Sequence, residues 1–289
     1  MTYIKYIKEI NLQTEFVPIK SKAGRIDMRR SLIDITCFSE KRKRLLLLLM
    51  EGKKDIDEIK EVLDETSPSI LPQIKILKEN GLIVQENGTY SLTRIGMLLV
   101  HMLQEVFQTF DVLEDHFDYF NEHDLTPIPK ELLNNIGELN NSEYIVPSLT
   151  DAFDPFTKIK PLTKASIWIK AFIAVYHPEY PPLASEMVSK GANLSLIMTE
   201  PMFEKMKNDY PEATRILKNS DNSRILIYKG EVMPSLIIAS DQYFLLSLML
   251  KTCRYDNSYL MGTKKEAIEW ATKLYEWYEK KSELVPKKD

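Results

Sequence analysis

The stretch SPSILPQIKILKENGLIVQENGTYSLT, from Ser67 to Thr93, decides the fold that we expect for the first part of this chain. In its first half, isoleucine and leucine recur every three or four residues, the spacing of one helix face, and Gly81 ends the pattern. In its second half, Asn87-Gly88 separates two apolar runs, which is a strong signal of a β-hairpin. The stretch therefore predicts a helix followed at once by a two-stranded wing.

The start of this helix has two possible positions. Ser67 is a suitable N-cap with Pro68 in the first helical position, but Pro72 then lies beyond the first turn, where proline is tolerated. If Ser69 is the cap instead, Pro72 takes the third position, where no helical hydrogen bond is lost. The sequence leaves both starts open.

Two further short helices precede this stretch. SEKRKRLLLLLMEG predicts a helix over residues 40–51, capped by Ser39 and ended by Gly52. Its six successive apolar residues go all the way round the helix, so it must be covered on more than one side. DIDEIKEVLD follows, with Asp55 and Glu58 in the spacing of a capping box. Three short helices closed by a hairpin are the plan of a winged helix-turn-helix.

A heptad-like seam runs from residue 93 to residue 120. Its members recur at spacings of four and three, which predicts one long helix of about 40 Å. One interpretation is that this helix, over residues 94–120, forms a homodimer; the other is that it packs within its own chain. We favour the dimer. The seam comprises Leu99, Leu103, Val106, Phe110, Leu113, Phe117 and Phe120.

The remainder of the chain predicts an α/β domain with a mixed sheet, so the whole is α+β or α/β. SIWIKAFIAVY, NLSLIM, RILIY, PSLIIAS and YFLLSLML are typical of strands, and PLASEMVSKG, PMFEKMKNDY and PEATRILKNS of helices between them. A last helix begins with Thr263 and Glu266 as a capping box and buries Trp270. We expect an arm over 1–27, a winged helix with its long helix over 28–121, and an effector domain over 122–289.

Composition excludes several classes of protein. The longest apolar run, Leu45 to Met50, is far shorter than a membrane span, and no export leader opens the chain. The two cysteines and four histidines have no metal-ligand spacing, and no phosphate-binding loop or nucleophile elbow is present. We therefore expect a cytoplasmic protein without catalytic residues, metal or cofactor, and with no membrane contact.

Charge distribution favours a nucleic-acid partner at one end of the chain. Net charge is −4, but residues 1–96 carry 17 Lys/Arg against 14 Asp/Glu, whereas the rest carries 21 against 28. We therefore expect the winged helix to bind double-stranded DNA, with hydroxyl and amide groups contacting bases or phosphates and cations contacting phosphates. A solvated surface is the simpler interpretation of each residue alone. The candidates are Lys41, Arg42, Lys43, Arg44, Ser67, Ser69, Gln73, Lys75, Lys78, Gln85, Asn87, Thr89 and Arg94.

Two motifs of the second domain are candidates for contact with a small-molecule effector. YHPEYP places His177 and Tyr180 in a proline-flanked loop after a strand, and KTCRYDNSY places Arg254 and Asp256 between two strands. A structured turn and a local ion pair are the simpler interpretations, and we favour them.

With these residues laid out, the chain resembles the FilR1-type family of archaeal winged-helix transcription regulators, found mainly in methanogens. The resemblance runs from Met28 to Tyr278. Its motifs are SLIDITCFSEKRKRLLLLLMEG, SILPQIKILKENGLI, YSLTRIGMLLV, HDLTPIP, YHPEYP, RYDNS and EAIEWATKLYEWY. It implies sequence-specific DNA binding, a second domain that senses a ligand or dimerises, and control of methanogenesis-related genes.

The second domain is also distantly similar to effector domains of sugar-responsive archaeal regulators, which are related to phospholipase D-like folds. That enzyme signature requires a lysine two residues after the histidine, but His177 is followed by Pro178 and Glu179, so hydrolase activity is not implied. Relatives carry a glycine before the RYD segment, where this chain has Thr252-Cys253. The alternative to a DNA-binding regulator is an adaptor whose winged helix docks on transcription machinery, which the acidic overall charge favours.

Overall fold

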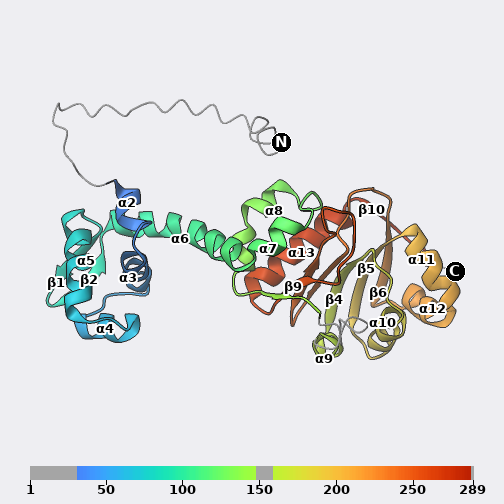
Figure 1. Ribbon diagram of the computed structural model, residues 1–289. Helices are drawn as coiled ribbons and strands as arrows, with labels where there is room; N and C mark the ends of the chain where they lie inside the picture. The colour runs from blue at the N-terminus through green and yellow to red at the C-terminus, as the bar shows by residue number, and fades with distance from the viewer. Residues whose placement is uncertain (1–30, 148–158, 288–289) are drawn as a thin grey trace, which may run out of the picture. The chain divides into compact units, whose positions relative to one another are not determined.

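The computed structural model describes residues 31–147 and 159–287, which belong to two units, Met1–Gly96 and Met97–Asp289 (Figure 1). The chain passes from the first unit to the second within one helix, α6 (Arg94–Asp115). The predicted arm over 1–27 lies outside the described residues. The division at Gly96 differs from the functional boundary that we place at residue 121, so the domain limits stay a prediction.

The first unit has the predicted order of helices followed by a hairpin. Two helices begin at the predicted caps: the Ser39 side chain accepts from Arg42 N at 3.4 Å, and Asp55 and Glu58 form both bonds of the capping box. Asn87 and Gly88 have φ of 50° and 82°, as a two-residue type I′ turn requires. The elements are α2 (Leu32–Thr36), α3 (Glu40–Met50), α4 (Ile56–Leu63), α5 (Ser67–Glu79), β1 (Ile83–Glu86) and β2 (Thr89–Leu92).

Helix α5 begins at neither of the two positions that the sequence left open. Its N-cap is Thr66, whose side chain makes no capping bond, and Ser67 is the first helical residue. Pro72 therefore lies inside the helix, where its missing N–H leaves the carbonyl of Pro68 without a helical hydrogen bond. Ile70 in this part of the helix is fully buried, so apolar packing stabilises the helix start although a helical hydrogen bond is missing.

The leucine run of α3 lies at the centre of the first unit, as its all-round apolarity predicts. Leu45, Leu46 and Leu49 are 0–2% exposed. Lys54 exchanges two main-chain hydrogen bonds with Tyr90 and so forms an isolated bridge to the hairpin, which the sequence did not indicate. At the start of α6, Gly96 lies so close to the carbonyl of Leu82 that a Cβ atom there would be 2.0 Å from its oxygen.

The long helix is shorter than predicted. α6 ends at Asp115, His116 leaves the helical conformation with φ of −120° and ψ of 28°, and α7 (Phe117–Glu122) begins a new helix. At 1.5 Å per residue, the 22 residues of α6 span about 33 Å. The prediction of a single helix over residues 94–120 is therefore wrong. The buried imidazole of His116 bonds to Ser142 Oγ at 2.8 Å, a tertiary contact that periodicity alone cannot reveal.

The second unit is built on one eight-stranded mixed sheet of order β10-β6-β5-β4-β7-β8-β9-β3. The neighbours β4, β5 and β6 are parallel, and the other pairs are antiparallel. The strands are β3 (Glu143–Ile145), β4 (Trp168–Ile173), β5 (Asn193–Thr199), β6 (Ser223–Tyr228), β7 (Leu236–Ser240), β8 (Phe244–Ser247), β9 (Tyr259–Gly262) and β10 (Ser282–Leu284). The mixed sheet confirms the predicted fold class.

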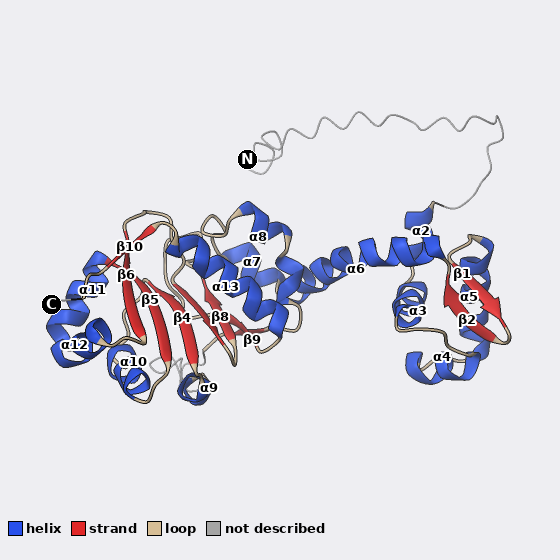
Figure 2. Ribbon diagram, turned by 180° about the vertical axis from the view of Figure 1, so that it is seen from behind, coloured by secondary structure: helices blue, strands red, loops and turns tan. Residues whose placement is uncertain are grey.

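Helices cover both faces of this sheet (Figure 2). Helix α13 packs on one face together with α7 and α8, and the side chain of its fully buried Trp270 donates to Leu132 O at 2.9 Å. Helices α10 and α12 pack on the other face. The remaining helices are α8 (Lys130–Asn134), a 3-10 turn (Ile136–Leu139), α9 (Lys160–Ala165), α10 (Tyr180–Ser189), α11 (Glu200–Asp209), α12 (Pro211–Asn219) and α13 (Lys265–Glu279).

Two details of the second unit differ from the sequence-based expectation. The predicted capping box at Thr263 and Glu266 is wrong, because Lys264 is the N-cap of α13 and makes no side-chain capping bond. Strands β3 and β10, at the two edges of the sheet, were not predicted. Each has three residues, too few to show an alternating pattern.

Candidate functional site

The outward face of α5 carries the candidate nucleic-acid contacts. Its exposed residues recur every three or four positions and so form one stripe along the helix. Lys75 and Lys78, both predicted contacts, lie on the stripe, whereas Leu71 (44% exposed) was missed because apolar residues were assigned to the core. An exposed leucine beside lysines can contact a thymine methyl group. The stripe, which we call the α5 stripe, comprises Pro68, Leu71, Pro72, Lys75, Lys78 and Glu79.

Three other predicted residues of α5 lie beside this stripe. Ser67 is half-buried at the helix start. Ser69 accepts a hydrogen bond from Lys41 Nζ, and Gln73 Oε1 accepts one from Arg42 Nη1 at 2.8 Å. The structure therefore brings α3 and α5 candidates together, but it directs them at each other.

The four consecutive cations of α3 do not form a patch, because each successive residue is turned by about 100° round a helix. Arg42 is only 9% exposed, and its guanidinium also donates to the carbonyls of Ile35 at 2.5 Å and Asp34 at 3.2 Å. Lys43 has a side chain 17% exposed, and Arg44 donates to Leu63 O at 3.0 Å. Arg42 thus ties α3 to α2, and Arg44 ties it to the end of α4.

Lys41 belongs to an ion pair at the surface of the first unit. Its ammonium lies 3.0 Å from Glu65 Oε2 and also donates to Ser69. The hydrogen bond from Ser69, followed by the contact with Lys41, lowers the pKa of Glu65 below its ordinary value. An exposed pair of this kind contributes little to stability and can exchange its partner for a phosphate.

The wing places its candidates at the surface. Gln85 accepts from Lys78 Nζ at 2.8 Å, so the hairpin is joined to the α5 stripe. Asn87 at the hairpin tip and Arg94 at the start of α6 are exposed. The half-buried Thr89 uses its hydroxyl to bond Glu86 O at 2.9 Å, within the turn.

In the second unit, the two candidate ligand motifs approach each other through their tyrosines. Burial raises the pKa of Tyr180 well above its ordinary value, and the phenols of Tyr255, Tyr243 and Tyr259 add to the effect. The His177 ring lies 5.3 Å from that of Tyr180. Tyr180 packs in the same core cluster as Tyr243 and Tyr259, which we call the tyrosine cluster, and Tyr259 ends the KTCRYDNSY motif. The sequence analysis selected Arg254 and Asp256 from that motif instead.

Neither of those two residues belongs to the tyrosine cluster. Arg254 is exposed. Asp256 accepts from the Ser258 amide at 3.0 Å and from its hydroxyl at 2.8 Å, and its Oδ2 lies 3.3 Å from Nε2 of the fully buried His123. These contacts fasten the segment to the end of α7. Cys253 has φ of 59°, so this turn contains a residue in the left-handed region.

Two general properties bear on function. Within residues 31–147 and 159–287, no group of three or more His, Cys, Asp or Glu side chains is arranged to hold a metal ion. Over the same ranges, no helix combines the length and apolarity needed to cross a membrane.

Family models match both units. The model of the N-terminal domain of methanogenesis regulatory protein FilR1 matches residues 31–111, and that of its middle domain matches residues 152–281. Methanogenesis regulatory protein FilR1 of Methanothrix harundinacea (strain 6Ac) is 24% identical over 267 residues, which cover 89% of this chain and 58% of the relative. The chain therefore spans little more than half the length of this relative.

Solved structures give weaker likenesses. TrmBL2, titled an archaeal chromatin protein with a novel mode of DNA binding, has a TM-score of 0.39 at 12% identity and covers 84% of this chain and 93% of its own. Quinone-bound YodB from B. subtilis has a TM-score of 0.25 at 26% identity, and the match covers 29% of this chain and 92% of YodB. The phospholipase D family member Nuc from Salmonella typhimurium has a TM-score of 0.36 at 10% identity, and the match covers 50% of this chain and 99% of Nuc.

Proposed function

Because the chain belongs to the FilR1 family of methanogenesis regulatory proteins, we propose that it is a cytoplasmic transcription regulator, not an enzyme. Its first unit binds double-stranded DNA, and its second unit responds to a small-molecule effector. Genes of methanogenesis are its proposed targets. The observation that carries the DNA-binding proposal is the α5 stripe, which presents Lys75 and Lys78 beside the hairpin.

In this arrangement α5 is the recognition helix of the winged helix-turn-helix. Lys75 pairs with Glu79 only at 3.8 Å, and both side chains are more than 60% exposed, so its ammonium is available to a phosphate. Lys78 reaches Gln85 on the hairpin, and the two together contact the backbone beside the groove that α5 enters. Leu71 and Pro72 then face base edges, where apolar contact favours thymine.

The test uses the full chain and a DNA duplex that it selects from a random library. Affinity should fall steeply with salt, and Lys75→Gln and Lys78→Gln should each reduce the slope of log K against log salt by about 0.9, because each neutralises one phosphate. Lys190→Gln, which changes an exposed lysine of the second unit, is the matched control and should leave the slope unchanged. Selection of no duplex, or an affinity indifferent to salt, would reject DNA binding and favour the adaptor.

We further propose that the regulator is a homodimer joined through α6. Five apolar residues of this helix recur at spacings of four, four, four and three, so they share one face. The five are Leu98 (63% exposed), Met102 (64%), Val106 (42%), Phe110 (54%) and Leu113 (38%). A second copy of the same face would cover them, and a two-fold dimer would present two recognition helices to a repeated site.

Light scattering on the full chain tests the dimer. Phe110→Glu should shift the protein toward the monomer, because burying an unpaired carboxylate between two apolar faces is unfavourable. His101→Glu is the matched control, since His101 is exposed and lies about 100° round the helix from Met102. A wild-type monomer, or a dimer that survives Phe110→Glu, contradicts this assignment.

A further inference from the structure

Three neighbouring strands carry a polar residue at the same level of the sheet. Lys170 of β4 is paired in register with Ser195 of β5, which is paired with Arg224 of β6. Parallel strands covered on both faces are normally apolar throughout, so this row departs from the pattern. The next row, Phe172–Ile197–Leu226, is buried under α13 as expected.

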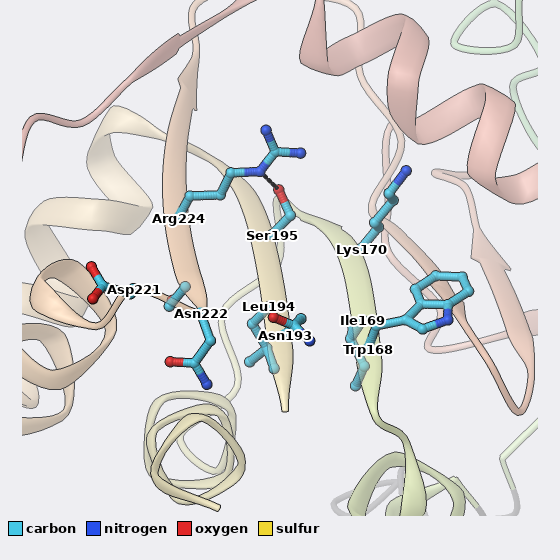
Figure 3. Close-up of a pocket in the computed structure, with 10 residues that line it drawn as sticks. Trp168, Ile169, Lys170, Asn193, Leu194, Ser195, Asp221, Asn222 and Arg224 are labelled. Carbon is cyan, nitrogen blue, oxygen red and sulfur yellow. Dashed lines mark hydrogen bonds between the residues drawn. The ribbon is translucent and has the colours of Figure 1, made fainter. Parts of the chain in front are cut away.

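The polar row borders a groove at the amino ends of these strands. Figure 3 shows Lys170, Ser195 and Arg224 on the same side of the sheet, with Trp168 and Asn193 nearer the starts of the strands. The groove has a volume of about 270 Å³, which suits a ligand smaller than a typical drug. Trp168 gives it one apolar side chain, whereas the side chains of Ile169 and Leu194 are buried in the core on the opposite face of the sheet.

Helix α13 supplies the partners of the polar row. The Ser195 hydroxyl accepts from Arg224 Nε at 2.6 Å and lies 2.6 Å from the hydroxyl of Tyr275. Lys170 Nζ donates to Glu276 Oε1 at 2.7 Å, and Arg224 Nη2 is paired with Glu279. Each cation is therefore neutralised by one glutamate, and the two cations flank a hydroxyl that is 6% exposed.

The two cations of the polar row have N–H groups that no described acceptor uses. Among the described contacts, Lys170 uses one of its three ammonium hydrogens, and Arg224 Nη1 has no protein partner. Ser223, whose buried hydroxyl has no partner in the described residues, precedes Arg224 on β6 and so faces the other side of the sheet. The carboxylate of Asp221 also lines the groove and is paired with Lys287. The unused donors of Lys170 and Arg224 are therefore the groups available to a ligand.

We propose that this groove binds a small organic carboxylate, held between Lys170 and Arg224 with its carbon skeleton toward Trp168. The unused donors of the two cations favour an acceptor-rich anion. The indole of Trp168 favours a carbon skeleton over an inorganic anion. Glu276 and Glu279 hold the cations while the groove is empty and compete with the ligand for them. The inference rests on the proposed function only for the ligand's role as effector; the binding itself does not depend on DNA.

Fluorine NMR of the full chain labelled with 5-fluorotryptophan measures this binding. The chain has three tryptophans, so three signals are expected, and Trp168→Phe assigns the one from the groove. Acetate, butyrate and phenylacetate are titrated at constant ionic strength, with the matching amides and inorganic phosphate as comparisons. The carboxylates should move the Trp168 signal saturably, and the amides should need about tenfold higher concentrations, because they lack the charge-assisted bonds.

Substitutions decide whether the row is the site. Lys170→Gln and Arg224→Gln should each weaken carboxylate binding about tenfold. Glu276→Gln should strengthen it by removing a competing carboxylate. Lys207→Gln is the matched control, since Lys207 is an exposed lysine of α11 that does not line the groove. The Trp270 and Trp277 signals show in each variant that the unit remains folded.

Several results would overturn the proposal: carboxylates no stronger than amides, phosphate stronger than carboxylates, no loss in Lys170→Gln and Arg224→Gln, or weaker binding in Glu276→Gln. DNA affinity is then measured with and without the bound carboxylate. A carboxylate that binds as described while the chain binds no DNA supports the site and rejects the proposed function. If the chain binds DNA but the carboxylates do not bind as described, only the proposed site is rejected.

Discussion

Arg42 provides the sharpest test of how the first unit is held together. We expect Arg42→Met to destabilise this unit while leaving the salt dependence of DNA binding unchanged in the molecules that stay folded. The reason is that its guanidinium bonds the carbonyls of Asp34 and Ile35 and the amide of Gln73, and its side chain is almost inaccessible. Methionine keeps the apolar stem and removes every one of these bonds.

The magnitude follows from the three bonds. A hydrogen bond to a charged group contributes about 1.5–3 kcal/mol, but the desolvation of a buried cation offsets part of the sum. Ile35 is fully buried, so its carbonyl would be left without a partner, whereas Asp34 and Gln73 are accessible enough to bond water. We therefore expect a loss of about 3 kcal/mol, roughly 15 °C in the unfolding midpoint of a unit of this size.

Hydrogen exchange in the full chain gives a readout specific to the first unit. A loss of about 3 kcal/mol should accelerate exchange of the α3 amides about 100-fold and leave the α13 amides unchanged. Lys75→Gln is the comparison, because it should lower the salt slope and keep exchange at its original rate. If Arg42→Met preserves the protection of α3 and lowers the salt slope by about 1, Arg42 contacts phosphate and the structural role is refuted.

Two other substitutions test close contacts. Gly96→Ala places a Cβ atom 2.0 Å from Leu82 O, so we expect a loss of about 2 kcal/mol despite the better helix propensity of alanine, measured as faster exchange of the hairpin amides. Burial lowers the pKa of His116, although Asp115 and the bond with Ser142 oppose the shift. The unfolded chain therefore binds its proton first, and stability should fall as pH drops below about 6.5. His116→Gln should flatten this fall in the thermal unfolding midpoint of the full chain, and an unaltered pH profile would contradict the assignment.

The sequence predicted α3, α4, α5 and the hairpin of the first unit because their signals are local, whereas α2 was not predicted. Ser39, the Asp55–Glu58 pair and Asn87-Gly88 each determine a cap or turn through bonds within a few residues. The seam over residues 94–120 failed for the opposite reason. Its break at His116 depends on burial and on a bond to Ser142, 26 residues away, and a periodic pattern carries no information about either.

The candidate site was predicted less well, because residue type does not specify which way a side chain points. Asp256 was selected as a charged residue in a loop, but its carboxylate bonds Ser258 and lies beside His123. The row formed by Lys170, Ser195 and Arg224 was missed, although each interrupts an apolar strand. Its members become neighbours only through the register of three strands, which no single segment reveals.

The run of cations in α3 shows why consecutive charge is a poor indicator of a phosphate-binding surface on a helix. Four successive residues point in four directions about 100° apart, so at most two of them can share a face. Lysines three residues apart, by contrast, lie on one side of a helix, as Lys75 and Lys78 do on α5. The spacing of the charges, and not their density, therefore places the proposed DNA contacts on α5 and leaves Arg42 to hold the helices together.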